Sequence, residues 1–153
     1  MATEPQPQST DRYEEDFYVW ALEQARLLQG RQYGSLDLDN LIEEIQGLAD
    51  TKKSAVLSSA RVVIEHLLKL QHSPAQDPRK VWAESVIEHR ARIEDELTPR
   101  LRQTLADELP EVYARARRVA ERKLRLYGED AAADGLPASC PYSLDQVIGD
   151  WWP

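Results

Sequence analysis

The sequence has little cysteine and no long apolar run. Cys140 is the only cysteine among 153 residues, so no disulfide can form within the chain and no cage of cysteines can hold a metal ion. The first ten residues lack the basic start and apolar run of a secretory signal, and no stretch approaches eighteen consecutive apolar residues. We therefore expect a cytoplasmic protein with no membrane span.

Motifs for common enzyme chemistry are missing as well. The chain contains no Gly-rich phosphate loop and no Gly-x-Ser-x-Gly elbow. Cys140 precedes Pro141, and no lysine or arginine lies within ten residues of it to stabilise a thiolate. A half-buried loop cysteine is therefore favoured over a reactive thiol.

Acidic residues outnumber basic residues in this chain. The net charge is -8, and such a field repels phosphate backbones and anionic membranes. One basic stripe runs against this trend, in which arginines recur at helical spacing with two further cations nearby: Arg115, Arg118, Arg122 and Arg125, with Arg117 and Lys123. A solvated helix face, or a contact for an acidic partner, is favoured over nucleic-acid binding, and a nucleic-acid-associated accessory factor using residues 115–125 stays the weaker alternative.

The chain divides simply. Residues 1–9 are rich in proline and glutamine, which predicts a disordered leader. Residues 10–153 have the length and composition of a single domain. No segment alternates as a strand does, so we expect an all-α fold, a single-domain bundle of about five helices with a short additional helix near the C-terminus.

The first two helices follow from apolar periodicity. A helix over 11–29 is predicted to begin at a capping box, Asp11 to Glu14, and to end at Gly30. One long or kinked helix is predicted over 37–72, because Gly47 costs only about 1 kcal/mol relative to alanine inside a helix. A hairpin turning near residues 49–51 is the alternative.

Prolines and glycines mark the later elements. Asp77-Pro78 predicts the start of a helix that runs to about Leu97, and Thr98-Pro99 predicts a restart. Pro110 either opens a separate helix over 111–127 or lies within one kinked unit, closed in both cases by Gly128. Residues 129–141 are expected to be a loop, and Ser143 is expected to cap the short last helix. Because each tryptophan can bury about 150–250 Å², at least one of the terminal pair, Trp151 and Trp152, should dock on the domain.

Glutamates and a histidine on the segment 40–72 suggest a metal site or an acid-base site. The distances between them argue against it. On a continuous helix Glu44 and His66 lie about 33 Å apart, and in a hairpin still about 15 Å. Carboxylate-bridged di-iron bundles need Glu three residues before a ligating His, and none of the histidines in this chain has one. No metal site and no cofactor are expected.

A small pocket around His66 is the other candidate. If the chain turns near residue 75, an antiparallel hairpin pairs His66 with about Glu84 and Lys69 with about Trp82. The candidate binding residues are His66, Lys69, Trp82, Glu84 and Glu88. The favoured alternative is a histidine at the edge of the core, with Glu65 and Lys69 forming a surface i,i+4 pair.

Several separate motifs, in order along the chain, together resemble one family. They are Tyr13, Asp16-Phe17-Tyr18-x-Trp20, Leu36-Asp37, Leu41-Ile42-Glu43-Glu44-Ile45, His66-Leu67-Leu68-Lys69, Trp82, Tyr113, and Cys140-Pro141-Tyr142 to Trp152-Pro153. The chain resembles the bacterial domain-of-unknown-function family numbered twenty-nine over about residues 11–153, although Leu70 stands where an aromatic residue is expected. The resemblance implies a bacterial helical protein and supplies no catalytic role.

The absence of a complete catalytic set, together with four tryptophans, favours a protein-interaction or regulatory module that binds a protein partner or itself. The alternative is a small enzyme or ligand-binding protein using the pocket around His66.

Overall fold

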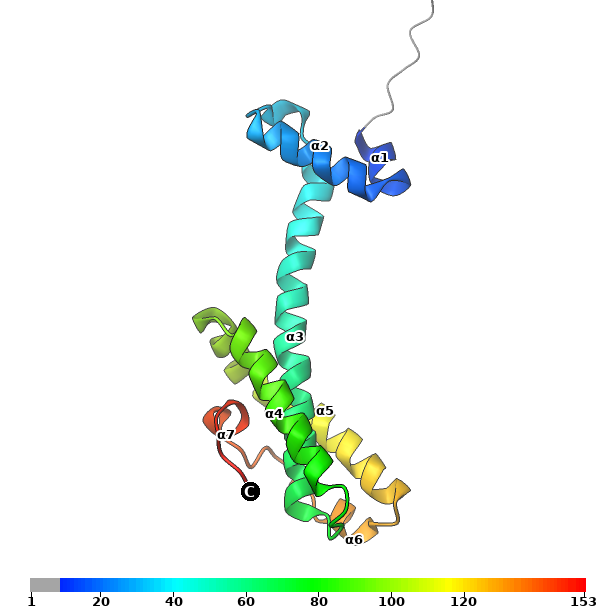
Figure 1. Ribbon diagram of the computed structural model, residues 1–153, viewed down its shortest axis with the longest axis vertical. Helices are drawn as coiled ribbons and strands as arrows, with labels where there is room; N and C mark the ends of the chain where they lie inside the picture. The colour runs from blue at the N-terminus through cyan, green and yellow to red at the C-terminus, as the bar shows by residue number, and fades with distance from the viewer. Residues whose placement is uncertain (1–8) are drawn as a thin grey trace, which may run out of the picture. The chain divides into compact units, whose positions relative to one another are not determined.

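The computed structural model describes residues 9–153 and is all-α, with no strand among those residues (Figure 1). The expected leader, 1–9, lies almost entirely outside the described residues. The elements are α1 Ser9–Glu15, α2 Phe17–Gln29, the 3-10 helix η1 Tyr33–Ser35, α3 Leu38–His72, α4 Arg79–Glu96, α5 Pro99–Leu126, α6 Asp130–Asp134 and α7 Leu144–Ile148. The all-α prediction is confirmed.

The contacts divide the chain into two compact units, one up to Asp50 and one over Thr51–Pro153, with α3 continuing through the boundary. We call them the N-terminal unit and the C-terminal unit. That residues 10–153 fold as one domain stays a prediction.

The predicted long helix is confirmed, and the hairpin near residues 49–51 is not formed. Helix α3 is continuous from Leu38 to His72 and contains Gly47 in its interior. The free-energy cost of one glycine is too small to end a helix whose second half packs on the core.

The first predicted helix is wrong in its extent. Position 11 lies inside α1, and the helix is interrupted at Asp16, whose side chain accepts a hydrogen bond from the backbone N–H of Val19 at 3.1 Å. An aspartate at an N-cap satisfies one of the free amides that begin a helix, so the chain starts again here.

The N-terminal unit has a small core held by polar contacts. Trp20 and Gln24 are buried, the Trp20 indole N–H donates to Asp37 at 3.1 Å, and the Gln24 side chain accepts from the Asp37 amide at 2.9 Å. The Tyr13 ring lies 4.9 Å from that of Trp20, and its hydroxyl donates to Glu44 at 2.6 Å. Helices α1 and α2 are thereby tied to the start of α3.

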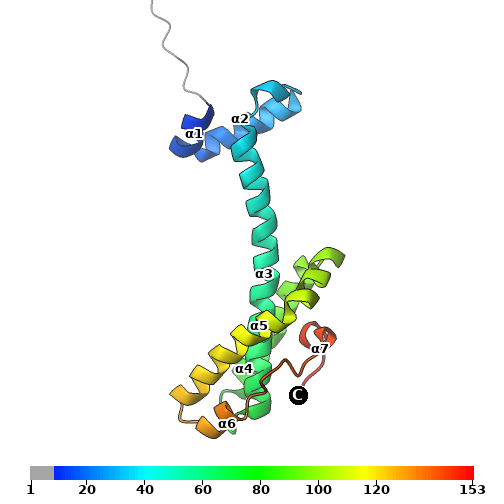
Figure 2. The same cartoon turned by 180° about the vertical axis from the view of Figure 1, so that it is seen from behind.

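The C-terminal unit is built on the second half of α3. Helices α4 and α5 cover opposite sides of this segment, as the two views show (Figures 1 and 2). Most of the core consists of aliphatic and small side chains from the three helices: Val56, Ala60, Val63, Ile64, Leu67, Leu68 and Leu70 of α3, Val86 and Ile93 of α4, and Leu105, Val112, Tyr113, Ala116, Ala120 and Leu124 of α5. The segment after α5 adds Ala133, Leu136, Tyr142 and Val147. Burial of these apolar groups is the main stabilising contribution.

Arg90 fastens the C-terminal segment to α4. Its guanidinium donates to the carbonyl oxygens of Val147 at 3.0 Å and of Gln146 and Trp151 at 2.7 Å each, and it lies 5.2 Å from the ring of Trp152. Trp151 packs against the core, as expected, whereas Trp152 is 41% exposed.

The elements after α4 agree with those predicted from the sequence, with one exception. Thr98 caps α5, and Ser143 and Gln146 form the predicted capping box of α7. Pro110 lies within α5, which is therefore one unit. Residues 129–141 are not entirely loop, because three successive alanines, the best helix formers, allow the short helix α6.

Gly128 ends α5 in the left-handed conformation, with φ of 75°, and the amide of Glu129 bonds the carbonyl of Leu124 at 2.9 Å. We predict that Gly128→Ala lowers the free energy of unfolding by about 1 kcal/mol, because an L side chain is strained at this φ. Gly47→Ala, in a helix interior with open space around the added methyl group, should instead raise it by about 0.5–1 kcal/mol. Urea denaturation followed by circular dichroism measures both, and equal effects of the two substitutions would contradict the assignment.

Candidate functional site

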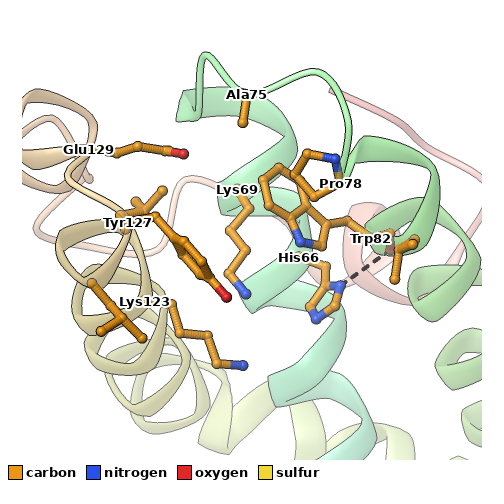
Figure 3. Close-up of a pocket in the computed structure, with 11 residues that line it drawn as sticks. His66, Lys69, Ala75, Pro78, Trp82, Lys123, Tyr127 and Glu129 are labelled. Atoms are coloured by element: carbon orange, nitrogen blue, oxygen red, sulfur yellow. Dashed lines mark hydrogen bonds between the residues drawn. The ribbon is translucent and has the colours of Figure 1, made fainter.

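A cavity of about 720 Å³ opens between α3, α4 and the end of α5, entirely within the C-terminal unit (Figure 3). We call it the His66 cavity. Its lining combines two lysines, a histidine and a glutamate with aromatic and aliphatic groups: His66, Lys69, Ala75, Pro78, Val81, Trp82, Lys123, Leu124, Leu126, Tyr127 and Glu129. In volume it falls within the range of small-molecule sites.

Glu65 lies beside this cavity and joins its two lysines. The Glu65 side chain is only 3% exposed, and its Oε1 accepts from Lys69 at 2.6 Å and from Lys123 at 2.7 Å. Lys69 comes from the same helix one turn later, whereas Lys123 comes from α5. The i,i+4 pair of Glu65 and Lys69 is therefore present as predicted, but its placement on the surface is wrong: a lysine from another helix reaches the same carboxylate, and both partners of the pair are buried.

The electrostatics of the pair favour two charged groups. Burial alone would raise the pKa of Glu65, but the hydrogen bonds from Lys123 and Lys69 outweigh it and hold that pKa below its ordinary value of 4.5. Burial lowers the pKa of Lys69, and the bond to Glu65 opposes this effect. The carboxylate thus stabilises the charged form of the buried ammonium against the effect of burial.

His66 is oriented by the backbone of α4. Its Nδ1 lies 3.3 Å from the carbonyl oxygen of Trp82, and because a carbonyl oxygen can only accept, the proton is on Nδ1. Burial lowers the pKa of His66, with the neighbouring Lys69 acting in the same direction, so the ring is neutral at neutral pH. Its Nε2 then carries a lone pair, 3.9 Å from Glu65 Oε1.

Cations outnumber anions around Glu65. Besides the two lysines, Arg61 Nη1 lies 3.9 Å from Glu65 Oε2, so three cations surround one carboxylate. The Lys69 ammonium also lies 5.7 Å from the ring centroid of Trp82. On the cavity wall, the buried Oε2 of Glu129 has no hydrogen-bond partner among the described residues.

The structure brings together three of the five candidate residues. His66, Lys69 and Trp82 line the cavity, whereas Glu84 and Glu88 are exposed and do not line it. Glu84 lies 3.9 Å from Lys80 in a solvent-exposed pair. The acidic group that meets His66 and Lys69 is Glu65.

Sequence reasoning missed the five lining residues from the end of α5 and the turn that follows, of which three carry polar groups: Lys123, Tyr127 and Glu129. Lys123 was visible only as a neighbour of the arginine stripe.

The basic stripe is not a uniform free face. Arg125 is engaged by Glu121 at 3.1 Å, Asp130 at 3.3 Å and Asp134 at 2.7 Å. Arg117 donates to the carbonyl oxygen of Pro137 at 2.8 Å. Together with Lys123, which bonds Glu65, these residues serve contacts within the C-terminal unit.

The structure also bears on metal binding, on Cys140 and on membrane-spanning helices. No group of three or more His, Cys, Asp or Glu side chains within residues 9–153 is arranged to hold a metal ion. Cys140 is half-buried and burial raises the pKa of its thiol, in line with the favoured interpretation. Over the same part of the chain, no helix has the length and apolarity to cross a membrane.

Fold and site together define an all-α protein with a ligand-sized cavity beside a buried carboxylate shared by two lysines. The chain belongs to the family described as domain of unknown function DUF29, which matches residues 12–152. The family resemblance noted in the sequence is thus confirmed. No curated protein and no solved structure matches the chain.

We predict that Glu65→Gln lowers the free energy of unfolding by about 3 kcal/mol at neutral pH, because it leaves the buried Lys69 ammonium without a counter-charge. The folded-state pKa of Glu65 is depressed, so its stabilisation is present above the ordinary value of 4.5 and is lost as pH falls through the folded-state value. The difference between wild type and variant should stay constant from about pH 5 to 8 and shrink below that range.

Urea denaturation at several pH values measures this difference. Glu84→Gln is the matched control, since its exposed pair with Lys80 contributes little. A Glu65→Gln variant as stable as the control would show that the shared carboxylate does not hold the site.

Proposed function

We propose that this protein is a protein-interaction module, and that its N-terminal unit binds a basic amphipathic helix of a partner protein. The observation that carries the proposal is the combination of exposed apolar side chains and concentrated negative charge in this one unit.

The N-terminal unit leaves more apolar groups exposed than it buries. Among its described residues, only Trp20 and Leu27 are buried large apolar side chains. Ten others are exposed, mostly on α2 and the first part of α3: Phe17, Tyr18, Val19, Leu22, Leu28, Tyr33, Leu38, Ile42, Ile45 and Leu48. A concentration of exposed apolar groups in so small a unit is typical of interaction surfaces.

Part of this set forms one stripe on α3. Leu38, Ile42 and Ile45 lie at i, i+4 and i+7, which places them on one face of the helix, and Leu48 continues it one turn later. All four are more than half exposed, at 55%, 53%, 62% and 68% respectively. An amphipathic partner helix recognises such a stripe with its own apolar face.

The charge of the protein is concentrated in the same unit. Residues 1–50 contain eleven acidic and three basic residues, a net charge of -8, whereas residues 51–153 contain sixteen of each. Asp39 and Glu43 are exposed on the same part of α3. Charge complementarity therefore favours a basic partner, because two copies of this unit would bring like charges together.

The direct test measures binding of a fluorescent Leu/Lys amphipathic helical peptide by anisotropy, with a Leu/Glu peptide of the same pattern as the charge control. The full chain should bind the basic peptide and not the acidic one. Ile45→Asp should weaken this binding by about tenfold or more, because it places a charge in the apolar stripe.

Ile87→Asp on α4 is the matched control, because Ile87 is exposed to a similar degree, 58%, in the C-terminal unit. Equal binding of both peptides, or equal effects of the two substitutions, would refute the proposal. Sedimentation of the chain alone as a dimer that Ile45→Asp dissociates would assign the surface to a second copy instead.

A further inference from the structure

We propose that the His66 cavity binds a small organic anion, with a flat apolar body and one carboxylate or phosphate group placed at Lys69 and Lys123. This inference concerns the C-terminal unit alone and does not rest on the proposed function.

The charge around Glu65 favours an anionic ligand. One carboxylate oxygen accepts from both lysines, at 2.6 and 2.7 Å, and neutral His66 contributes no charge. The two ammonium groups and Arg61, which lies 3.9 Å from Glu65, stand against the carboxylates of Glu65 and Glu129 and leave a surplus of one positive charge. A surplus charge in a partly desolvated site attracts an anion strongly, although the chain as a whole is acidic.

The two lysines have more N–H donors than their bonds to Glu65 use. Each lysine ammonium has three N–H groups, and within residues 9–153 the side-chain hydrogen bonds of Lys69 and of Lys123 use Glu65 as their acceptor. Both ammonium groups belong to the lining of the cavity. An anionic group placed here accepts from two lysines, and such charge-assisted hydrogen bonds are among the stronger ones.

The rest of the cavity wall is aromatic and aliphatic. In Figure 3 the rings of Trp82 and Tyr127 stand on either side of the Lys69 side chain. Pro78, Val81 and Leu124 add further apolar lining. A flat apolar body next to the anionic group fits walls of this kind, and the volume of about 720 Å³ leaves room for it.

Glu129 restricts the ligand further. Its buried Oε2 lies on the same wall without a hydrogen-bond partner among the described residues, and a buried acceptor without a partner is costly. A ligand N–H or O–H at the end away from the anionic group would satisfy this oxygen. The expected ligand therefore has one anionic group, an apolar ring and a hydrogen-bond donor.

Three indole probes separate these requirements. Indole-3-acetate carries a carboxylate, indoxyl phosphate carries a phosphate, and indole-3-acetamide has nearly the shape of the first without its charge. Titration calorimetry with the full chain at neutral pH should show binding of at least one anion, with the amide at least about tenfold weaker. The tighter of the two anions identifies the group that the site prefers.

Two variants test the residues. Lys123→Gln should weaken binding of the anion by about tenfold and leave the amide unchanged, since it removes the surplus charge while Lys69 still pairs with Glu65. Lys53→Gln is the matched control: this lysine is exposed to a similar degree, 41% against 47%, and pairs with Glu108 outside the cavity. Tyr127→Ser alters a side chain that is 78% exposed, so it leaves the core intact, and it should weaken every probe that binds.

The proposal is overturned if no anion binds at millimolar concentration, if the amide binds as tightly as indole-3-acetate, or if Lys123→Gln and Lys53→Gln behave alike. Thermal unfolding of each variant checks that it is folded. Should Lys123→Gln fail to fold, the comparison of acetate with amide in the wild type, and the effect of Tyr127→Ser, still decide the matter.

Discussion

The carboxylate of Glu65, shared between Lys69 of its own helix and Lys123 of α5, is the interaction on which the candidate site depends. It joins α3 to α5 beside the cavity and opposes the effect of burial, which lowers the pKa of Lys69. A hydrophobic group in place of Glu65 would pack against the same neighbours, but it would leave two ammonium groups facing each other across the site. Burying these charged groups costs desolvation free energy that an apolar side chain at this position would avoid. In return, the cavity has an excess of positive charge.

The two units differ in net charge and in how much apolar surface they bury. The C-terminal unit has a continuous apolar core and equal numbers of acidic and basic residues, with a local excess of cations at the His66 cavity. The N-terminal unit has few buried apolar groups, relies on polar contacts around Asp37, and carries a net charge of -8. An acidic surface with exposed apolar side chains suits a basic protein segment, whereas an open cavity lined by two lysines suits a small anion. The single sequence thus supports two separate binding hypotheses, one for each unit.

Much of the fold could be predicted because local signals decide it. Apolar periodicity gave α3 and α4, and Thr98 and Ser143 marked the starts of α5 and α7. Asp16 was missed as a cap because Asp11 offered a competing capping box a few residues earlier.

The candidate site was harder to predict. The register of the helical hairpin correctly placed His66 and Lys69 near Trp82. Register alone does not determine which face of α4 lies toward the cavity. Glu84 is two residues beyond Trp82, about 200° further round the helix, so it points away from the cavity. Lys123 depends on where α5 packs, which no local pattern in the sequence determines.

The most direct measurement is the ionisation state of the shared site, read from the ¹³C chemical shifts of the Glu65 carboxyl carbon and the Lys69 Cε atom across a pH titration. The account predicts that at neutral pH Glu65 is ionised and Lys69 is charged, with Glu65 taking up its proton below 4.5. A protonated Glu65 or a neutral Lys69 at neutral pH would contradict it, since the two groups would then not form the ion pair on which the site depends.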